Sequence, residues 1–177
     1  KKPKLIGDHQ IENASNAIAA ILKLNEVGYS FSKRIINIGL TNTSWPGRLE
    51  KGKLDKIHIY LDGAHNIDGA SQILKYFKSK KIKLWLILGM LNNKDIYGFL
   101  KKLKPIIIGV IAVPIPDEKN CFKIKEISKT CEKLKLTNVC CRNILEANKL
   151  LLKEIKPKTT LISGSLYLVG KVRGEYL

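Results

Sequence analysis

The sequence predicts a doubly wound α/β domain, with a mostly parallel sheet flanked by helices, over about residues 49–177. Two observations lead to this prediction. Apolar runs of strand length alternate with segments of helical period, which is the pattern of strand–helix units. Two of these runs, 83–90 and 106–113, are continuously apolar, as expected for parallel strands that are covered on both faces.

The region before this domain predicts helices. A helix is expected from His9 to about Val27, because its apolar residues recur at three- and four-residue spacing and Gly28 suits a helix stop. Ser30 is expected to cap a second, shorter helix. The polar segment that follows contains Pro and Gly and is the best candidate for a domain boundary, which divides the chain into residues 1–43, a linker 44–48 and the α/β domain 49–177.

Within the α/β domain each element follows from its apolar period and from the turn residues beside it. Three or four interleaved strands are expected, and no internal repeat is visible. The expected strands are 56–61, 83–90, 106–113, at best a short one in 137–141, and 159–165, which runs into the segment LYLVGKVR; the expected helices are 67–79, 94–104, 122–134 and 143–155.

The net charge of +17 invites a nucleic-acid hypothesis. Only four of the 32 basic residues are arginine, although base and phosphate recognition favours the arginine fork. The lysines also occur in almost every segment of the chain, with few aromatic residues among them. We therefore expect no nucleic-acid partner, and a diffuse positive field that favours anionic substrates.

The cysteine and hydropathy patterns restrict the classes of protein to which the chain can belong. The four cysteines form no C-x-x-C pair, so reduced thiols in a cytoplasmic protein are expected. No apolar stretch approaches the roughly 18 to 20 residues that span a bilayer, so no membrane partner is expected. The chain opens on KKPKLIGDHQ without a starting Met, and we expect it to be a piece of a longer protein.

The segment IHIYLDGAHNIDGA is the strongest candidate for a functional site. Ligands of such sheets bind beyond the carboxyl ends of the strands, where Asp62 and His65 are expected to lie. Asn66 is placed to cap the next helix, whose free N–H groups suit an anion. A carboxylate suits ribose hydroxyls, and an imidazole suits a phosphate or carboxylate. From spacing alone, the reading that these are only turn and cap residues is equally good, and G-x-G-x-x-G is absent.

Three further positions are candidates from their surroundings. Ser165 follows the last strand in SGSLYLVG, where a hydroxyl and backbone N–H groups can meet a substrate. Arg48 in WPGRLE would project from a hinge toward a phosphate, although a lone Arg in a loop is more often a solvated charge. Asn13 shares a helix face with His9, and such a pair is more often a satisfied polar contact.

Five motifs in this order resemble one family. They are GDHQIENASNAIAAI, WPGRLE, LDGAHNIDGA, LGMLNNKDI and ISGSLYLVGKVR, and together they are similar to the C-terminal part of folylpolyglutamate synthase/dihydrofolate synthase, a Mur-type amide ligase. The resemblance covers essentially the whole chain. It implies a Rossmann-like Mur ligase C-terminal domain at 49–177 and, at 1–43, the helical tail of the central ATP-binding domain. One departure is Ile67, where the family usually has Pro, and we expect at most a modest effect on helix geometry.

The resemblance implies an activity and a set of roles. Family members use ATP and Mg2+ to convert a pteroate or folate carboxylate to an acyl phosphate, which L-glutamate attacks to give an amide, ADP and phosphate. Matched motif by motif, Asn13 would contact adenine, Arg48 the ATP phosphates and Asp62 the ribose. His65 would be catalytic, at the nucleotide or the incoming glutamate, and Ser165 would contact glutamate.

The chain lacks part of what this activity needs. It contains no G-x-x-x-x-G-K-[ST] loop, and in the family that loop, the Mg2+ ligands and most of the pterin site belong to the upstream domain. The fragment is therefore expected to be inactive alone and, by resemblance, to be part of a cytoplasmic monomer. A Mur-type cell-wall amino-acid ligase and a non-catalytic basic α/β nucleic-acid-binding module remain as alternatives. The sequence does not separate dihydrofolate synthase from folylpolyglutamate synthase.

Overall fold

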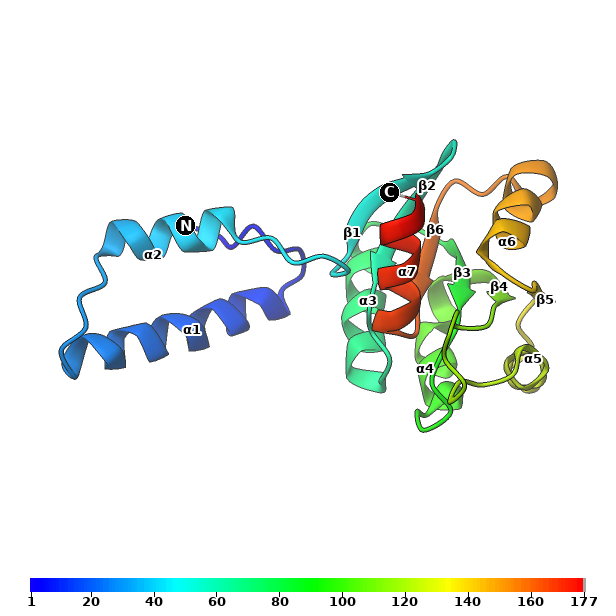
Figure 1. Ribbon diagram of the computed structural model, residues 1–177, viewed down its shortest axis with the longest axis horizontal. Helices are drawn as coiled ribbons and strands as arrows, with labels where there is room; N and C mark the ends of the chain where they lie inside the picture. The colour runs from blue at the N-terminus through cyan, green and yellow to red at the C-terminus, as the bar shows by residue number, and fades with distance from the viewer. Residues whose placement is uncertain (177) are drawn as a thin grey trace. The chain divides into compact units, whose positions relative to one another are not determined.

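The computed structural model describes residues 1–176 and divides the chain into two compact units, Lys1–Arg48 and Leu49–Leu177 (Figure 1). Each unit is described by itself. No helix in the described part of the chain is long and apolar enough to cross a membrane.

The first unit consists of two helices, α1 (His9–Glu26) and α2 (Lys33–Asn42). The first agrees with the expected helix. The cap of the second was predicted wrongly, because the hydroxyl of Ser32, and not that of Ser30, accepts a hydrogen bond from the Ile35 N–H at 3.3 Å. Both serines stand before the helix, and only the residue directly before its first turn can reach the free N–H groups there.

Large apolar side chains remain exposed on this helix pair. Among the described residues of the unit only Gln10 and Gly47 are buried. The exposed apolar side chains on the two helices and the turn between them are Ile11, Leu22, Leu24, Val27, Tyr29, Phe31, Ile35 and Ile38. Helices of this length owe most of their stability to tertiary packing of an apolar face.

The second unit is built on a six-stranded sheet in the order β1-β2-β6-β3-β4-β5. All neighbouring strands pair in parallel except β1, which forms an antiparallel hairpin with β2. The strands are β1 (Glu50–Leu54), β2 (Ile57–Asp62), β3 (Leu84–Leu88), β4 (Ile107–Ala112), β5 (Asn138–Cys140) and β6 (Thr160–Ser163).

Helices cover both faces of this sheet. The helices are α3 (Ile67–Ser79), α4 (Ile96–Leu103), α5 (Ile124–Lys133), α6 (Ile144–Leu150) and α7 (Leu166–Tyr176). On one face, β2 presents Ile57, Ile59 and Leu61 to a core that includes residues of α6 and α7. On the other face, Tyr60 of β2 packs edge-on against Phe77 of α3, with ring centroids 5.0 Å apart. The α/β fold with a mostly parallel sheet is therefore confirmed.

Two elements were not predicted. The segment of β1, EKGKL, has no apolar alternation, because the strand lies at the sheet edge and buries only Leu54. The segment after the last strand forms α7, although Gly170 and Gly174 lower its intrinsic helix propensity. This helix is held by the burial of Leu168, Val169 and Val172.

The end of α6 also differs from the expected single helix 143–155. The α-helix gives way to a π-helical turn, η2 (Leu151–Ile155), which ends at Lys156 in a left-handed conformation with φ of 47°. A shorter 3-10 turn, η1 (Lys104–Ile106), contains Pro105 and follows α4.

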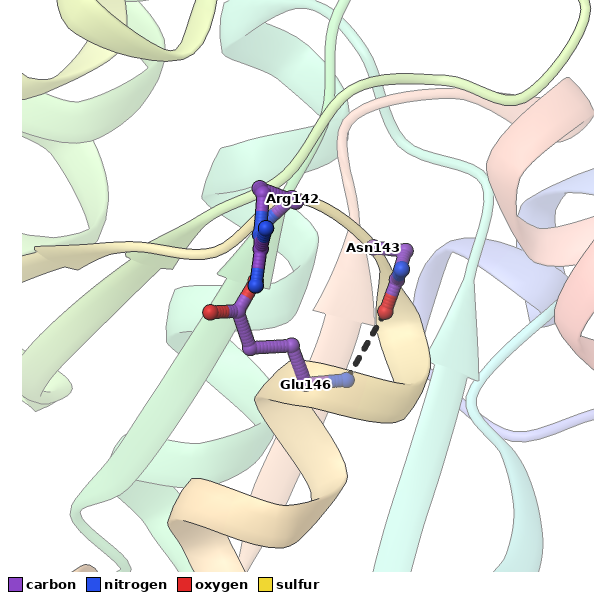
Figure 2. A network of polar contacts seen from close by, with 3 residues as sticks. All are labelled: Arg142, Asn143 and Glu146. Atoms are coloured by element: carbon purple, nitrogen blue, oxygen red, sulfur yellow. Dashed lines mark hydrogen bonds and ion pairs between the residues drawn. The ribbon is translucent and has the colours of Figure 1, made fainter.

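The start of α6 is held by local hydrogen bonds among Arg142, Asn143 and Glu146 (Figure 2). The Asn143 side chain accepts a hydrogen bond from the Glu146 N–H at 2.8 Å, and the Glu146 carboxylate accepts one from the Arg142 N–H at 2.6 Å. The Asn143 contact satisfies one of the N–H groups that a helix start leaves free, and the Glu146 contact holds the residue before the cap. The Arg142 N–H, together with the guanidinium of the same residue, lowers the pKa of Glu146.

Candidate functional site

Three strand ends meet at the carboxyl edge of the sheet. Asp62 at the end of β2 pairs in register with Ser163 at the end of β6, and Ser163 also pairs with Leu88 at the end of β3. The turns that follow these strands, 63–66, 164–165 and 89–90, therefore leave the sheet side by side. The last strand inserts between two earlier ones, which is the kind of topological position where ligands of open α/β sheets bind.

Asp62 ties two backbone segments together at this edge. One carboxylate oxygen accepts a hydrogen bond from the Leu49 N–H and the other from the Ala64 N–H, both at 2.9 Å. Leu49 is 2% exposed and has a positive φ of 46°, so its N–H is held in an unusual backbone conformation. The carboxylate therefore holds Leu49, the first residue of the second unit, against the turn that follows β2.

The turn after β2 orients a histidine. The Nδ1 of His65 lies 2.9 Å from the Gly63 carbonyl oxygen. Because a carbonyl oxygen only accepts, Nδ1 carries the proton of this hydrogen bond, and in the neutral ring Nε2 is then left as an acceptor. His65 is half-buried, so the ring is held by the turn and still reaches the surface.

The expected helix cap is confirmed at the end of the same turn. The Asn66 side chain accepts from the Gly69 N–H at 2.8 Å, and α3 begins at Ile67 despite the absence of Pro at that position. At the next strand end Asp95 caps α4 in the same way, accepting from the Gly98 N–H at 2.8 Å.

The turn after β6 is bonded to the turn after β2. The Gly164 N–H donates to the Ala64 carbonyl at 3.0 Å, and the Ser163 hydroxyl donates to the same oxygen at 3.2 Å. These two contacts hold the two candidate turns at a fixed separation. Ser163 and Ala64 lie within the motifs SGSLYLVG and IHIYLDGAHNIDGA, but neither could be assigned a role from the sequence, because their contact joins segments far apart in the chain.

Ser165 takes a helix-cap position. Its hydroxyl oxygen accepts from the Tyr167 N–H at 3.1 Å, its carbonyl accepts from the Val169 N–H, and the residue is 3% exposed. Its hydroxyl proton is not used in that cap contact. The role at glutamate that the resemblance implies for Ser165 stays a prediction.

Asn13 and Arg48 belong to the first unit. Asn13 donates through Nδ2 to the Gln10 side-chain oxygen at 3.1 Å, and the Gln10 amide nitrogen lies 2.9 Å from His9 Nε2. Gln10, 3% exposed, thus links His9 to Asn13, a connection that spacing alone did not reveal. Arg48 is exposed and lies over the Trp45 ring, 6.0 Å from its centroid.

Metal-ligating groups do not gather in this part of the protein. Across residues 1–176 there is no group of three or more His, Cys, Asp or Glu side chains that could hold a metal ion. Within the same range the four cysteines are free thiols.

Two thiols are inert by burial, which yields a testable prediction. Burial, and to a smaller extent the neighbouring Cys140, raises the pKa of Cys131 to about 12, and burial with Glu146 raises the pKa of Cys141 to about 11. Only the thiolate is nucleophilic. At pH 8 the exposed Cys140 is expected to react first with Ellman's reagent, whereas Cys131 and Cys141 react only on unfolding, as peptide mapping would show. Cys140→Ser should remove the fast phase; a fast phase that persists on Cys131 or Cys141 peptides contradicts the assignment.

Comparison with known sequences gives a consistent result. A family model described as the dihydrofolate synthetase C-terminal domain matches residues 48–174. A probable dihydrofolate synthetase from Schizosaccharomyces pombe is 30% identical over 94% of this chain and 42% of its own length. A dihydrofolate synthase/folylpolyglutamate synthase from Bacillus subtilis is 29% identical over 97% of this chain and 40% of its own length. The chain thus spans about two fifths of the length of these curated relatives.

Solved structures agree in fold. The folylpolyglutamate synthase of Mycobacterium tuberculosis complexed with ADP and AMPPCP has a TM-score of 0.86 at 22% identity and covers 98% of this chain and 41% of its own. The folylpolyglutamate synthase of Thermotoga maritima has a TM-score of 0.77 at 30% identity, with 98% and 40% covered. A bifunctional folylpolyglutamate synthase/dihydrofolate synthase with Mn, AMPPNP and L-glutamate bound has a TM-score of 0.77 at 20% identity, with 99% and 41% covered.

Proposed function

The chain belongs to the family of dihydrofolate synthetases and folylpolyglutamate synthases, and on that premise we propose that it is part of an ATP-dependent ligase that adds L-glutamate to dihydropteroate, to folates or to both. Residues 49–177 are the glutamate-ligase domain of that enzyme, residues 44–48 its linker, and residues 1–43 the tail of its ATP-binding domain. The observation that carries the proposal is the joining of the D-G-A-H-N and S-G-S turns at one sheet edge, in a chain of this family.

The carboxyl edge suits one wall of a nucleotide site. Carboxylate oxygens accept hydrogen bonds from ribose hydroxyls, and Asp62 stands at the end of β2, where it also accepts from the N–H groups of Leu49 and Ala64. In the proposed complex Arg48 meets the phosphates, and Asn13, oriented by Gln10, meets adenine.

The proposed reaction releases a proton, which gives His65 a proposed role. Transfer of the terminal phosphoryl group breaks an O–P bond of ATP and forms an acyl phosphate and ADP. The glutamate amine then attacks the acyl carbon, the C–O bond to phosphate breaks, and the amine loses a proton. With Nδ1–H held by the Gly63 carbonyl, the Nε2 of His65 can accept a hydrogen bond or a proton from that amine. Ser165 contacts glutamate through its remaining hydroxyl proton.

Exposed apolar side chains at this edge are consistent with its being covered by another part of the enzyme. Ile67, Tyr97, Leu166 and Tyr167 lie in the first turns of α3, α4 and α7 and are 41% to 62% exposed. Large exposed apolar residues that gather at one edge mark an interaction surface. Covering this edge would exclude water from an acyl phosphate, which water would otherwise hydrolyse.

The proposed Mg2+ ion is not assigned to this chain. When bound, Mg2+ would neutralise charge on the transferring phosphoryl group. Its ligands, like the P-loop and the pterin site, are proposed to belong to the upstream domain. We also propose that the whole enzyme is a cytoplasmic monomer.

The proposal is tested by measuring ADP formation. The full-length protein is expected to form ADP only when both L-glutamate and dihydropteroate or a folate are present, and product analysis then separates the two activities. The isolated chain, residues 1–177, should form no glutamate-dependent ADP, because the groups that hold the ATP phosphates are not all in it. Activity of the isolated chain would refute the assignment of the phosphate site to the upstream domain. Glutamate-independent ATP hydrolysis, or none, by the full-length protein would refute the ligase.

The comparisons favour the folate ligase over the two alternatives. No feature of the described residues points to a muramoyl peptide as the acceptor. Assays with other amino acids and acceptors would detect a cell-wall ligase directly.

A further inference from the structure

Lysines converge at the amino end of the sheet. Five short segments lead directly into the strands β2, β3, β4, β5 and β6; they are residues 53–56, 78–83, 101–104, 133–135 and 153–158. These segments contain fourteen lysines and two acidic residues. The rest of residues 49–177 contains eleven basic and ten acidic residues. We call the fourteen lysines the amino-end lysine surface; it holds nearly all of the net charge of this unit.

The lysines of this surface are available to a ligand. All fourteen are exposed, and none forms an ion pair within residues 1–176. Two have aromatic contacts: Lys80 lies 5.3 Å from the Tyr76 ring centroid and Lys101 lies 5.9 Å from that of Tyr97. The ion pairs of this unit involve other residues, such as Lys171 with Asp117 at 2.7 Å.

Helix electrostatics account for only part of this surface. Lysines in the last turn of an α-helix complement its dipole, which explains Lys78, Lys101, Lys102 and Lys133. The same effect fades beyond the last turn, so it does not explain Lys83 and Lys158, which stand just before the strands. Like charges so close together repel one another, and a bound polyanion would relieve that repulsion.

The strand order gives the surface a linear form. In the order β2-β6-β3-β4-β5, neighbouring strands lie about 4.8 Å apart, so the starts of the five strands, which the lysine segments precede, form a row of roughly 19 Å. This row lies at the opposite end of the strands from Asp62 and Ser163, and the six residues of β2 alone span roughly 20 Å. The surface is therefore distinct from the candidate active site, and its charge does not serve to attract substrates to that site.

The sequence alone led to the expectation of no nucleic-acid partner, but with the lysines brought to one end of the sheet we propose that the amino-end lysine surface binds the phosphate backbone of nucleic acid without sequence preference. A row of lysines suits a linear polyanion, because counterion release needs only cationic groups along the backbone. The five segments contain no arginine, so bidentate reading of bases is not expected. They also contain none of the exposed large apolar side chains that membrane insertion or a protein interface core would use.

The test compares two variants of equal charge in the full-length protein. The first neutralises the surface with Lys80→Gln, Lys81→Gln, Lys83→Gln and Lys104→Gln. The control neutralises four exposed lysines outside it, with Lys119→Gln, Lys123→Gln, Lys125→Gln and Lys129→Gln. All eight side chains are exposed, so both variants should fold, which circular dichroism verifies. Fluorescence anisotropy with labelled oligo(U) RNA and oligo(dT) DNA is recorded between about 50 and 200 mM salt.

The expected result is a difference between the two variants. The first should lose about tenfold or more in affinity at low salt, and the slope of log K against log salt should fall by about 0.7 for each lost contact. The control should stay within about twofold of the unchanged protein. Equal weakening by both variants would show attraction by net charge alone and overturn the proposal. Absence of binding near about 0.1 M salt, or binding only to phosphatidylserine vesicles, would overturn it as well.

Discussion

Asp62→Ala is expected to lower the free energy of unfolding by about 2 to 4 kcal/mol. The carboxylate accepts from the N–H groups of Leu49 and Ala64, and alanine leaves both without this acceptor at a half-buried position. Chemical denaturation of the full-length protein, followed by circular dichroism, measures the loss. Asp68→Ala is the matched control: this carboxylate is exposed in the first turn of α3, so its removal should cost only about 0.3 to 1 kcal/mol.

The same substitution should also weaken ATP use. If Asp62 binds the ribose, its loss removes ground-state binding, so KM for ATP should rise roughly tenfold or more while kcat changes less. Arg48→Ala should raise KM in the same direction. Because Asp62 fixes Leu49, the neighbour of Arg48, the two substitutions should be non-additive in the double variant. An unchanged KM in both single variants would remove the nucleotide assignment, and stability equal to that of Asp68→Ala would contradict the anchoring role.

Gly164→Ala is expected to destabilise the protein by about 3 to 5 kcal/mol or to prevent folding. Gly164 has a φ of 102°, which L side chains rarely adopt. An added Cβ would lie 2.5 Å from Leu88 Cδ1 and 2.7 Å from the Gly89 carbonyl oxygen. The second neighbour is backbone, so the turn itself must move, and with it the hydrogen bond from the Gly164 N–H to Ala64.

Gly170 provides a matched control, at a position where an alanine side chain fits. Gly170 lies in α7, is exposed, and has no atom within 4 Å of an added Cβ. Gly170→Ala should therefore stabilise the protein by about 0.5 to 1 kcal/mol, because alanine has the higher helix propensity. Thermal unfolding should show a lower melting temperature for Gly164→Ala and a higher one for Gly170→Ala than for the unchanged protein. A melting temperature for Gly164→Ala at or above that of the unchanged protein would show that the turn does not need glycine.

Local signals in the sequence predicted most of the elements. The helix 67–79 agrees residue for residue with α3, because an Asn cap, an amphipathic period and a following lysine-rich loop all act within a few residues. The strand β1 and the helix α7 were missed, since each is stabilised by what it packs against. The polar segment of β1 pairs with β2 at the sheet edge, and α7 buries three side chains despite two glycines.

For the candidate site, too, the sequence predicted the residues but not their contacts. Asp62, His65 and Ser165 could be named from motifs, because the family resemblance rests on short runs of residues. The contacts of these residues could not be named, since they join segments far apart in the chain. Ala64 receives hydrogen bonds from Ser163 and Gly164, about a hundred residues away, only because β6 inserts between β2 and β3.

By itself the sequence determined the α/β class, most helix and strand positions, the family resemblance and the total charge, because these depend on composition and on neighbours along the chain. Only the tertiary structure decided which strand ends meet and where the charge lies. The lysines that look evenly spread in the sequence precede five different strands, and parallel pairing brings those strand starts to one end of the sheet. Strand order is set by packing between distant segments, and no local pattern records it.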